Sequence, residues 1–356
     1  MNTPLVPIFD GHNDVLLRLL RASSAGPERD FLEGDGRGHW DLPRARKGGL
    51  AGGFFAVYVS SREEGGLDVD AMMSQAAYDV PLPLPIPLAP AQEVTLAMAS
   101  LLLRLERASA GAFKICRSAS DIRRCLADGT MAAIFHIEGA EAIDPELATL
   151  DVLHAAGLRS IGPVWSRPNM FGHGVPFRYP STPDTGPGLT ESGRALVRAC
   201  NRLGIMIDLS HLNEAGFWEV AELSDAPLVA THSNAHAICP HSRNLTDKQL
   251  DAIAESDGMV GVNFATAFIR PDGRRDEDTP LDLLADHVDH LVSRLGIDRV
   301  GLGSDFDGAT IPAAIGDVAG LPNLVSTLRR RGYDESSLRK ICHQNWIRVL
   351  ETTWGS

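Results

Sequence analysis

The sequence predicts a (β/α)8 barrel on three observations: eight short apolar runs, helical patterns between most of them, and a length that suits one large α/β domain. The chain has 356 residues, of which 44% are hydrophobic and 22% are charged, an ordinary composition for a globular protein. Because α/β barrels often exceed the usual domain length as one unit, we expect a single barrel domain over residues 1–356. A doubly wound sheet is the alternative, and the number of strands slightly disfavours it.

The eight runs are almost continuously apolar, which is typical of parallel strands that are covered on both faces. We expect strands, in chain order, at 5–9, 53–59, 131–137, 158–165, 204–209, 227–231, 258–264 and 299–304.

The helices between the runs begin and end with recognisable signals. Thr190 precedes one helical pattern and Gly204 follows it, while Thr246 and Gln249 form a capping box at the start of another. A third, long helix is expected to end at Gly296.

Two segments interrupt the alternation of strands and helices. The proline-rich stretch at 81–90 is expected to be a rigid loop before a helix at 91–109, because proline disrupts helices and central strands. After the fourth strand, residues 169–188 are rich in glycine and proline. A loop of that length is often a lid or a structural excursion.

The charge balance excludes several classes of partner. Acidic residues number 46 and basic residues 33, giving a net charge of −13, which argues against nucleic acid and anionic membranes. No apolar run approaches the roughly 18 residues that a membrane span needs, and the N-terminal pattern is not that of a signal peptide. The five cysteines form no CxxC spacing, which fits a reducing compartment. We therefore expect a cytoplasmic protein.

Titratable side chains stand at the ends of five predicted strands. The parallel strands of a barrel bring their carboxyl ends to one face, so these side chains are expected to converge there. They are His12, Asp14, Glu138, His211, His232 and Asp305.

Five of these side chains are nitrogen and oxygen donors that suit zinc or a similar divalent ion. They exceed what one tetrahedral site needs. If Glu138 bridges two ions, then His12 and Asp14 complete one site, and His211 and His232 complete the other. A shared hydroxide would fill the remaining positions, giving a two-metal hydrolytic centre.

Each candidate also has a structural interpretation. A histidine at a strand end often caps or fills a polar core, and Asp14 and Asp305 could be turn residues. Their joint placement at five strand ends is much harder to obtain by chance. Asp305, which is left over from the metal sites, is then the acid/base that moves a proton to the leaving group.

Five blocks of the sequence, in this order, resemble the membrane (renal) dipeptidase family, peptidase family M19: FDGHND, IEGAE, IDLSH, PLVATHSNAHAICPHSRNLTD and VGLGSDFDGA. The resemblance covers nearly the whole chain, from FDGHNDVLLRL to NWIRVLE. It implies a (β/α)8 barrel, a binuclear zinc centre and hydrolysis of dipeptides, with tolerance of a D-residue at the C-terminal position.

The resemblance also assigns roles to single residues. His12 and Asp14 fall on the first-metal ligands, Glu138 on the bridging carboxylate, and His211 and His232 on the second-metal ligands.

Outside the metal centre, Arg243 matches the arginine that binds the substrate's terminal carboxylate, for which a guanidinium fork is suited. Asp305 matches the aspartate near the scissile bond. The sequence departs from the renal enzyme at two substrate-side positions: Trp165 stands in place of a histidine, and Phe268 in place of a tyrosine. Tryptophan donates one hydrogen bond but cannot take a proton, so substrate preference is expected to differ.

Three functions follow. The first is a zinc-dependent dipeptidase that cleaves free dipeptides, including L-Xaa-D-Xaa. The second is a hydrolase of the same chemistry with another small amide, such as an N-acyl amino acid, a lactam or a modified peptide. The third is a catalytically silent barrel that binds a peptide or a metal. Since symmetric pairs are the commonest oligomers, and by the same resemblance, we also expect a homodimer of a soluble, bacterial-type member.

Overall fold

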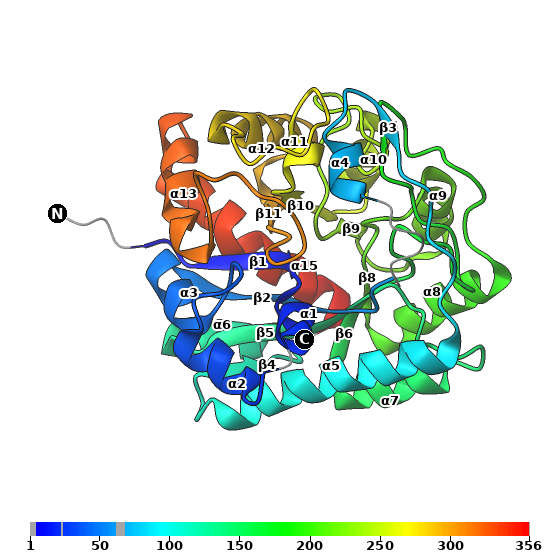
Figure 1. Cartoon of the computed structure of the whole chain (residues 1–356), viewed down its shortest axis with the longest axis horizontal. Coiled ribbons are helices and arrows are strands. Elements are labelled where there is room, and N and C mark those ends of the chain that lie inside the picture. The colour runs from blue at the N-terminus through cyan, green and yellow to red at the C-terminus, as the bar shows by residue number, and fades with distance from the viewer. Residues whose placement is uncertain (1–4, 23, 62–67, 356) are drawn as a thin grey trace.

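The computed structural model describes residues 5–22, 24–61 and 68–355. Eight parallel strands follow one another around a barrel in the order β1, β2, β5, β6, β8, β9, β10 and β11, with helices outside (Figure 1). The barrel closes where Asp208, just after β8, pairs with Val229 of β9. The predicted (β/α)8 fold is therefore confirmed.

The strands are β1 (Ile8–Asn13), β2 (Leu50–Tyr58), β3 (Tyr78–Asp79), β4 (Phe113–Ile115), β5 (Met131–Glu138), β6 (Leu158–Gly162), β7 (Arg178–Tyr179), β8 (Met206–Ile207), β9 (Val229–Ala230), β10 (Met259–Asn263) and β11 (Val300–Gly303). The helices are α1 (Val15–Arg21), α2 (Pro27–Arg29), α3 (Leu42–Gly48), α4 (Val69–Met73), α5 (Leu88–Ala108), α6 (Ala119–Asp128), α7 (Ala148–Ala156), α8 (Glu191–Leu203), α9 (Glu214–Leu223), α10 (Asp247–Glu255), α11 (Thr266–Ile269), α12 (Leu281–Leu295), α13 (Leu321–Arg330), α14 (Glu335–Arg339) and α15 (Asn345–Trp354).

All eight expected strands are present, with shifted ends. The first runs over residues 8–13 rather than 5–9, so His12 lies inside the strand. The sequence did not predict β3, β4 and β7. Two of these have two residues each and pair with one another, Tyr78 opposite Tyr179, across about a hundred residues of chain, so no local pattern marks them. Because β7 lies within 169–188, that loop is an excursion that carries a strand of its own.

The helix signals behave as expected. The Thr190 side chain accepts a hydrogen bond from the first turn of α8, which ends at Gly204 in the left-handed conformation. The capping box of Thr246 and Gln249 is present at α10. One boundary was wrong: α5 begins at Leu88, inside the proline-rich stretch, because the N–H groups of a first turn have no partner within the helix and proline is tolerated there.

A tryptophan side chain from the last helix, α15, fills one end of the barrel interior. Trp346 of α15 is fully buried among side chains of the barrel interior, and its indole N–H donates to the carbonyl of Leu302. A β-carbon at Gly11 of β1 or Gly261 of β10 would collide with this indole ring. Glycine at these positions therefore gives α15 room to seal the barrel end.

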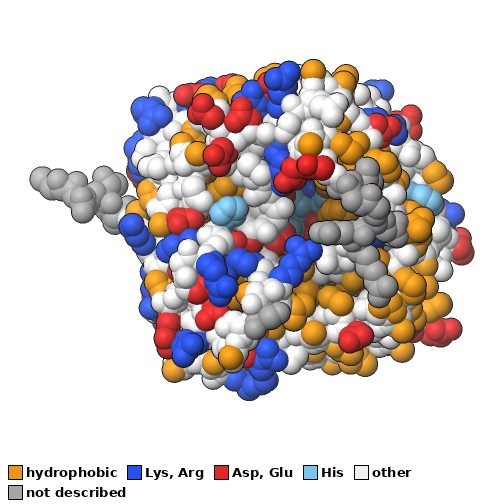
Figure 2. All heavy atoms as spheres, viewed as in Figure 1, with side chains coloured by type: hydrophobic (Ala, Val, Ile, Leu, Met, Phe, Trp, Pro, Cys, Tyr) orange, Lys and Arg blue, Asp and Glu red, His pale blue; other side chains and the backbone are white. Residues whose placement is uncertain are grey.

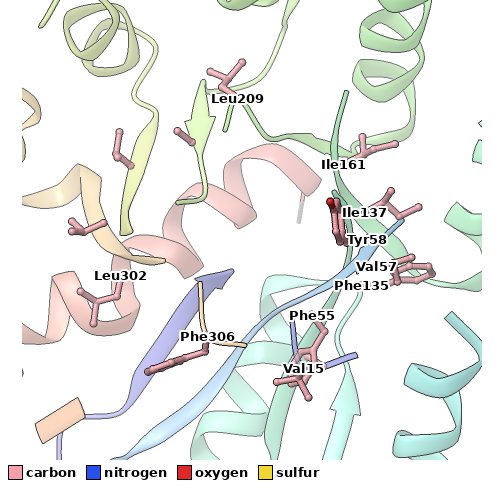
Figure 3. Packing of buried hydrophobic residues seen from close by; sticks show 14 of the residues in the cluster. Val15, Phe55, Val57, Tyr58, Phe135, Ile137, Ile161, Leu209, Leu302 and Phe306 are labelled. Atoms are coloured by element: carbon pink, nitrogen blue, oxygen red, sulfur yellow. The ribbon is translucent and has the colours of Figure 1, made fainter. Parts of the chain in front are cut away.

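The outer face of the strands packs against the helices. Along β2 the side chains alternate, so that Phe54 belongs to the interior cluster while Phe55 and Val57 belong to the outer one. Figure 3 shows Val57 close to Phe135 and Ile137 of β5, and Phe55 close to Val15 of α1. This double burial explains the uninterrupted apolar runs. Within the described residues, no helix is both long and apolar enough to span a membrane.

Candidate metal centre

The six side chains predicted to converge lie at the carboxyl ends of the strands. Glu138 is the last residue of β5, and Asp14 directly follows β1. The others follow β8, β9 and β11 within a few residues, apart from His12, which lies in β1. The five predicted metal ligands are each at most 5% exposed, whereas Asp305 is partly exposed.

Glu138 lies at the centre of the cluster. Its Oε1 atom is 2.9 Å from Nε2 of His211, 3.4 Å from Nε2 of His232 and 3.7 Å from Nε2 of His12. Three imidazoles from three strands thus direct the same nitrogen at one carboxylate oxygen, which is the arrangement expected around a shared ligand.

A second group of possible ligand atoms adjoins the first. Nε2 of His12 is 3.5 Å from Oδ2 of Asp14, and ligand atoms of His12, Asp14 and Asp305 all lie within 4.8 Å of one another. Asp305 is therefore as close to this group as the predicted ligands are. The Asn263 side-chain amide donates to Oδ2 of Asp305 at 3.0 Å and holds that carboxylate in place.

The backbone at the site has an unusual conformation. His211 and Asp305 have φ of 69° and 60°, in the left-handed region that residues other than glycine seldom adopt. A β-carbon at Gly308 would collide with the carboxylates of both Asp14 and Asp305. The turn after β11 therefore needs glycine so that these two side chains can approach.

Negative charge dominates the cluster, although His12 and Arg243 offset part of it. Burial raises the pKa of Glu138 well above its usual range, and the charges of Asp14 and Asp305 raise it further. Burial alone would lower the pKa of His12, but the negative charges around it, above all that of Glu138, outweigh burial and raise it to about 10. A cluster that holds protons this strongly also favours a metal cation in their place.

The other two histidines are in the state that metal binding requires. Burial lowers the pKa values of His211 and His232 well below the usual range, and the charges of Arg243 and His12 lower them further. Both imidazoles are therefore neutral at physiological pH and can offer a nitrogen lone pair.

The donor set fits one or more divalent ions. Both ring nitrogens of His12 and Oδ1 of Asp14 are buried without a hydrogen-bond partner among the described residues, although buried polar atoms nearly always have one. Neutral imidazoles and carboxylates at these distances are typical zinc ligands. The residues therefore fit a metal centre.

Arg243 is buried beside this centre. Charge alone would place it on the surface, yet it is 4% exposed. Its guanidinium donates to the Ser233 hydroxyl at 3.2 Å and to the His232 carbonyl at 3.0 Å, and lies 5.7 Å from the centre of the Phe268 ring. Burial lowers the pKa of Arg243 to about 10, a shift that Asp305 and Glu138 oppose, so the side chain stays charged at neutral pH.

A cavity of about 430 Å³ opens over the centre and is lined by Trp165 and Phe268 as well as by Glu138, His211 and Asp305. The Trp165 ring lies 5.7 Å from the His211 ring. Figure 2 shows acidic, basic and histidine side chains mixed near the middle of this face of the molecule. Both substrate-side positions identified from the sequence thus face the same space as the candidate ligands.

Sequence reasoning missed several residues of the site. Asn263 ends β10, and the strand-end argument that found Glu138 could have found it too. Tyr58 likewise ends β2 and packs 5.1 Å from the Trp165 ring. Phe177 and Arg275, which line the cavity from loops, follow no periodic pattern that could have marked them.

Comparison with known proteins agrees with this geometry. The family model described as membrane dipeptidase (peptidase family M19) matches residues 4–354. A crystal structure of a metallo peptidase from Rhodobacter sphaeroides, liganded with a phosphinate mimic of the dipeptide L-Ala-D-Ala, is 59% identical with a TM-score of 0.96 and covers 99% of this chain and 100% of its own.

Two curated relatives are also similar. An uncharacterized protein in the pqqA 5′ region of Klebsiella pneumoniae is 53% identical over 72% of this chain and 94% of its own length. Dipeptidase tcpJ of Claviceps purpurea is 29% identical over 96% of this chain and 76% of its own length. The chain therefore belongs to the membrane dipeptidase family, peptidase family M19, and is a metal-dependent hydrolase of that family.

Proposed function

We propose that the protein is a zinc-dependent dipeptidase that hydrolyses free dipeptides, including L-Xaa-D-Xaa compounds. The observation that carries this proposal is the position of Glu138 Oε1, 2.9–3.7 Å from three imidazole nitrogens, with a buried, charged Arg243 that donates to the backbone carbonyl of one of those histidines, His232. One carboxylate shared by two ligand groups suits a pair of ions, and one fixed cation suits a substrate with a free carboxylate.

The residues divide into two ligand sets. His12, Asp14 and Glu138 would hold one zinc ion, and Glu138, His211 and His232 the other, with Glu138 bridging. When bound, such a pair of ions lowers the pKa of a water molecule and polarises the scissile carbonyl.

The other side chains bind the substrate and move a proton. Arg243 takes the terminal carboxylate through its guanidinium fork, and its place against His232 limits the distance between that carboxylate and the scissile bond. Asp305, which is close to His12 and Asp14, would protonate the departing amine. Burial raises the pKa of Asp305, which suits a group that must carry a proton.

The stereochemical part of the proposal is supported by the Rhodobacter sphaeroides relative, whose ligand mimics L-Ala-D-Ala. Trp165 and Phe268 supply apolar walls in the cavity, and we assign them to contacts with the substrate's side chains.

A second candidate is a hydrolase of the same chemistry that acts on another small amide, such as an N-acyl amino acid, a lactam or a modified peptide. Trp165 favours it, because the family resemblance puts a substrate-contacting histidine at this position, and an indole, unlike an imidazole, cannot take a proton. This candidate differs from the first only in the substrate.

A substrate panel with the zinc-loaded protein separates the two. It pairs L,L with L,D dipeptides and includes N-blocked dipeptides and dipeptide amides. Cleavage of free dipeptides alone, with L,D compounds accepted, is the expected result. Cleavage of blocked amides only would contradict the dipeptidase and support the second candidate. No cleavage of any amide would contradict both candidates.

Three further points belong to the proposal. A single domain is consistent with one barrel whose eight strands are spread along the chain from β1 to β11. A cytoplasmic location is supported by five free, buried cysteines, since thiols persist in reducing compartments. A homodimer rests on the prevalence of symmetric pairs, and light scattering on the purified protein would test it.

A further inference from the structure

Behind His232 lie two buried side chains to which the proposed function gives no role, Thr231 and Asp208. Thr231 is wholly buried and Asp208 is 1% exposed. They come from the turns after β9 and β8, where the barrel closes through the pairing of Asp208 with Val229. The closure point of the barrel is therefore also the support of one candidate metal ligand.

Asp208 accepts hydrogen bonds at both of its oxygens. Oδ1 accepts from the backbone N–H groups of Ser210 at 3.0 Å and Thr231 at 2.8 Å. Oδ2 accepts from the Thr231 hydroxyl at 2.5 Å. Ligand atoms of Asp208, His12 and His232 also lie within 4.8 Å of one another, but the oxygens of Asp208 are already occupied by donors. Asp208 therefore supports the ligands instead of joining them.

These contacts fix the direction of the single proton on the Thr231 hydroxyl. The Thr231 hydroxyl donates to Oδ2 of Asp208, and a hydroxyl has only one proton to donate, so that proton points at Asp208. The same hydroxyl oxygen is 2.8 Å from Nδ1 of His232, and with its proton committed it can only accept there. Nδ1 of His232 must therefore carry the imidazole proton.

The tautomer decides which nitrogen of His232 is free. With the proton on Nδ1, the lone pair is on Nε2, which lies 3.4 Å from Oε1 of Glu138 and 3.2 Å from Nε2 of His211. This is the nitrogen that faces the shared ligand. Partners of this kind behind a metal-binding histidine orient its ring and raise its basicity.

We propose that Thr231 and Asp208 are positioning residues that lock His232 in the Nδ1–H tautomer and thereby determine the affinity of the ion held by His211, His232 and Glu138. The inference rests on the proposed metal centre and adds to it an asymmetry within that ligand set. Within the described residues, the Ser166 hydroxyl is the one hydrogen-bond partner of Nδ1 of His211, at 2.8 Å, and no carboxylate is bonded to that hydroxyl. His232 is thus the more firmly oriented of the two histidines.

The test is zinc binding to the full-length protein, measured by competition with a chromophoric chelator, together with the visible absorption of the cobalt-substituted protein. Thr231→Val keeps the shape of the side chain and removes the hydroxyl. Asp208→Asn replaces the carboxylate that accepts the hydrogen bond of this hydroxyl. Thr231→Ser restores the hydroxyl. Ser166→Ala is the matched change behind His211, and Ser160→Ala removes a buried hydroxyl from His136, which is not a proposed ligand.

We expect wild type to bind two zinc ions. In Thr231→Val one of the two should bind about ten- to a hundredfold more weakly, with a changed cobalt spectrum, and Thr231→Ser should restore both readouts. Asp208→Asn should weaken the same ion, and Ser166→Ala should have the smaller effect. Ser160→Ala should leave affinity unchanged.

Several results would overturn the inference. These are wild-type affinity and spectrum in both Thr231→Val and Asp208→Asn, no rescue by Thr231→Ser, or an equal loss in Ser160→Ala. Thermal unfolding of the metal-free variants shows whether a substitution merely disrupts folding. If Thr231→Val does so, the zinc affinities of Asp208→Asn and Ser166→Ala are compared instead. Failure of the proposed function has a different result, namely a wild-type protein that binds no metal or cleaves no amide.

Discussion

The two sides of the cavity are built from different parts of the chain. The proposed metal-binding side comes from residues at or near the ends of barrel strands, such as Glu138 of β5 and His12 of β1. The side proposed to face the substrate comes from loops and short helices, with Trp165 and Phe177 after β6 and Phe268 in α11. The backbone hydrogen bonds between the barrel strands hold the first side in place. The second side lies on loops that connect these strands. Changes on the first side should abolish the chemistry, and changes on the second should redirect it.

The largest expected effect is that of Glu138→Gln. An amide keeps the shape of the side chain but removes the charge that both ligand sets share, so we expect loss of both ions and a fall in kcat/KM of at least about 10⁴. Metal analysis after gel filtration and dipeptide hydrolysis check this. Retention of two ions by the variant would remove Glu138 from the centre of the site.

Asp305→Asn is expected to come next. The amide cannot donate a proton to the departing amine as a carboxylic acid does, so kcat should fall by about 10²–10⁴ while both ions stay bound. Pre-steady-state hydrolysis and metal content measured on the same sample test this. Wild-type turnover would contradict the proposed role, and loss of the ions would make Asp305 a ligand instead.

Arg243→Met tests the junction between the two sides. Removing a charged hydrogen-bond donor costs about 1.5–3 kcal/mol, so kcat/KM for free dipeptides should fall by about ten- to a hundredfold. Dipeptide amides, which lack the carboxylate, serve as the control and should be affected much less. Equal losses for acids and amides would show that Arg243 acts on folding and not on the substrate's carboxylate.

The metal side should also respond to pH. Burial alone would lower the pKa of His12, but the surrounding carboxylates raise it to about 10, so below that pH an incoming ion must displace a proton. Affinity should therefore decrease as pH falls, by about tenfold per pH unit for each proton displaced. Zinc competition at pH 6, 7 and 8 measures the slope, and an affinity independent of pH would contradict this charge balance.

Trp165→His should have the smallest effect on the chemistry and a selective effect on substrates. The indole ring lies 5.1 Å from the Tyr58 ring and 5.7 Å from the rings of Phe177 and His211, and Trp165 is not itself a proposed metal ligand. We expect unchanged metal content and changes of a few fold in the relative kcat/KM of different dipeptides, in line with the modest discrimination of apolar pockets. Loss of metal would erase the distinction between the two sides.

The same contrast explains what the sequence could predict. Parallel strands are marked by apolar runs, and the residues that end them share one face, so Glu138, His211 and His232 could be placed together from sequence alone. The strand-end rule also covers Asn263, which was overlooked. It does not reach Arg243, which was identified only by family resemblance, because its burial depends on contacts with Ser233 and Phe268 that no local pattern encodes.

The substrate side was harder to predict for a physical reason. The pairing of Tyr78 with Tyr179 joins two loops that are far apart in the sequence, and two-residue strands have no periodicity to detect. Phe177, just before β7, lines the cavity from a segment that the sequence identified only as a long loop. Loops of this kind take their shape from the scaffold that they cover.

The measurement that tests the central claim most directly is anomalous X-ray diffraction at the zinc absorption edge from crystals of the zinc-loaded protein. We predict two peaks, one on each side of the Glu138 carboxylate, and each about 2.0–2.2 Å from the ligand atoms of its own set. One set is His12 and Asp14, and the other is His211 and His232. A single peak, or two peaks that do not share Glu138, would contradict the account of a carboxylate-bridged pair.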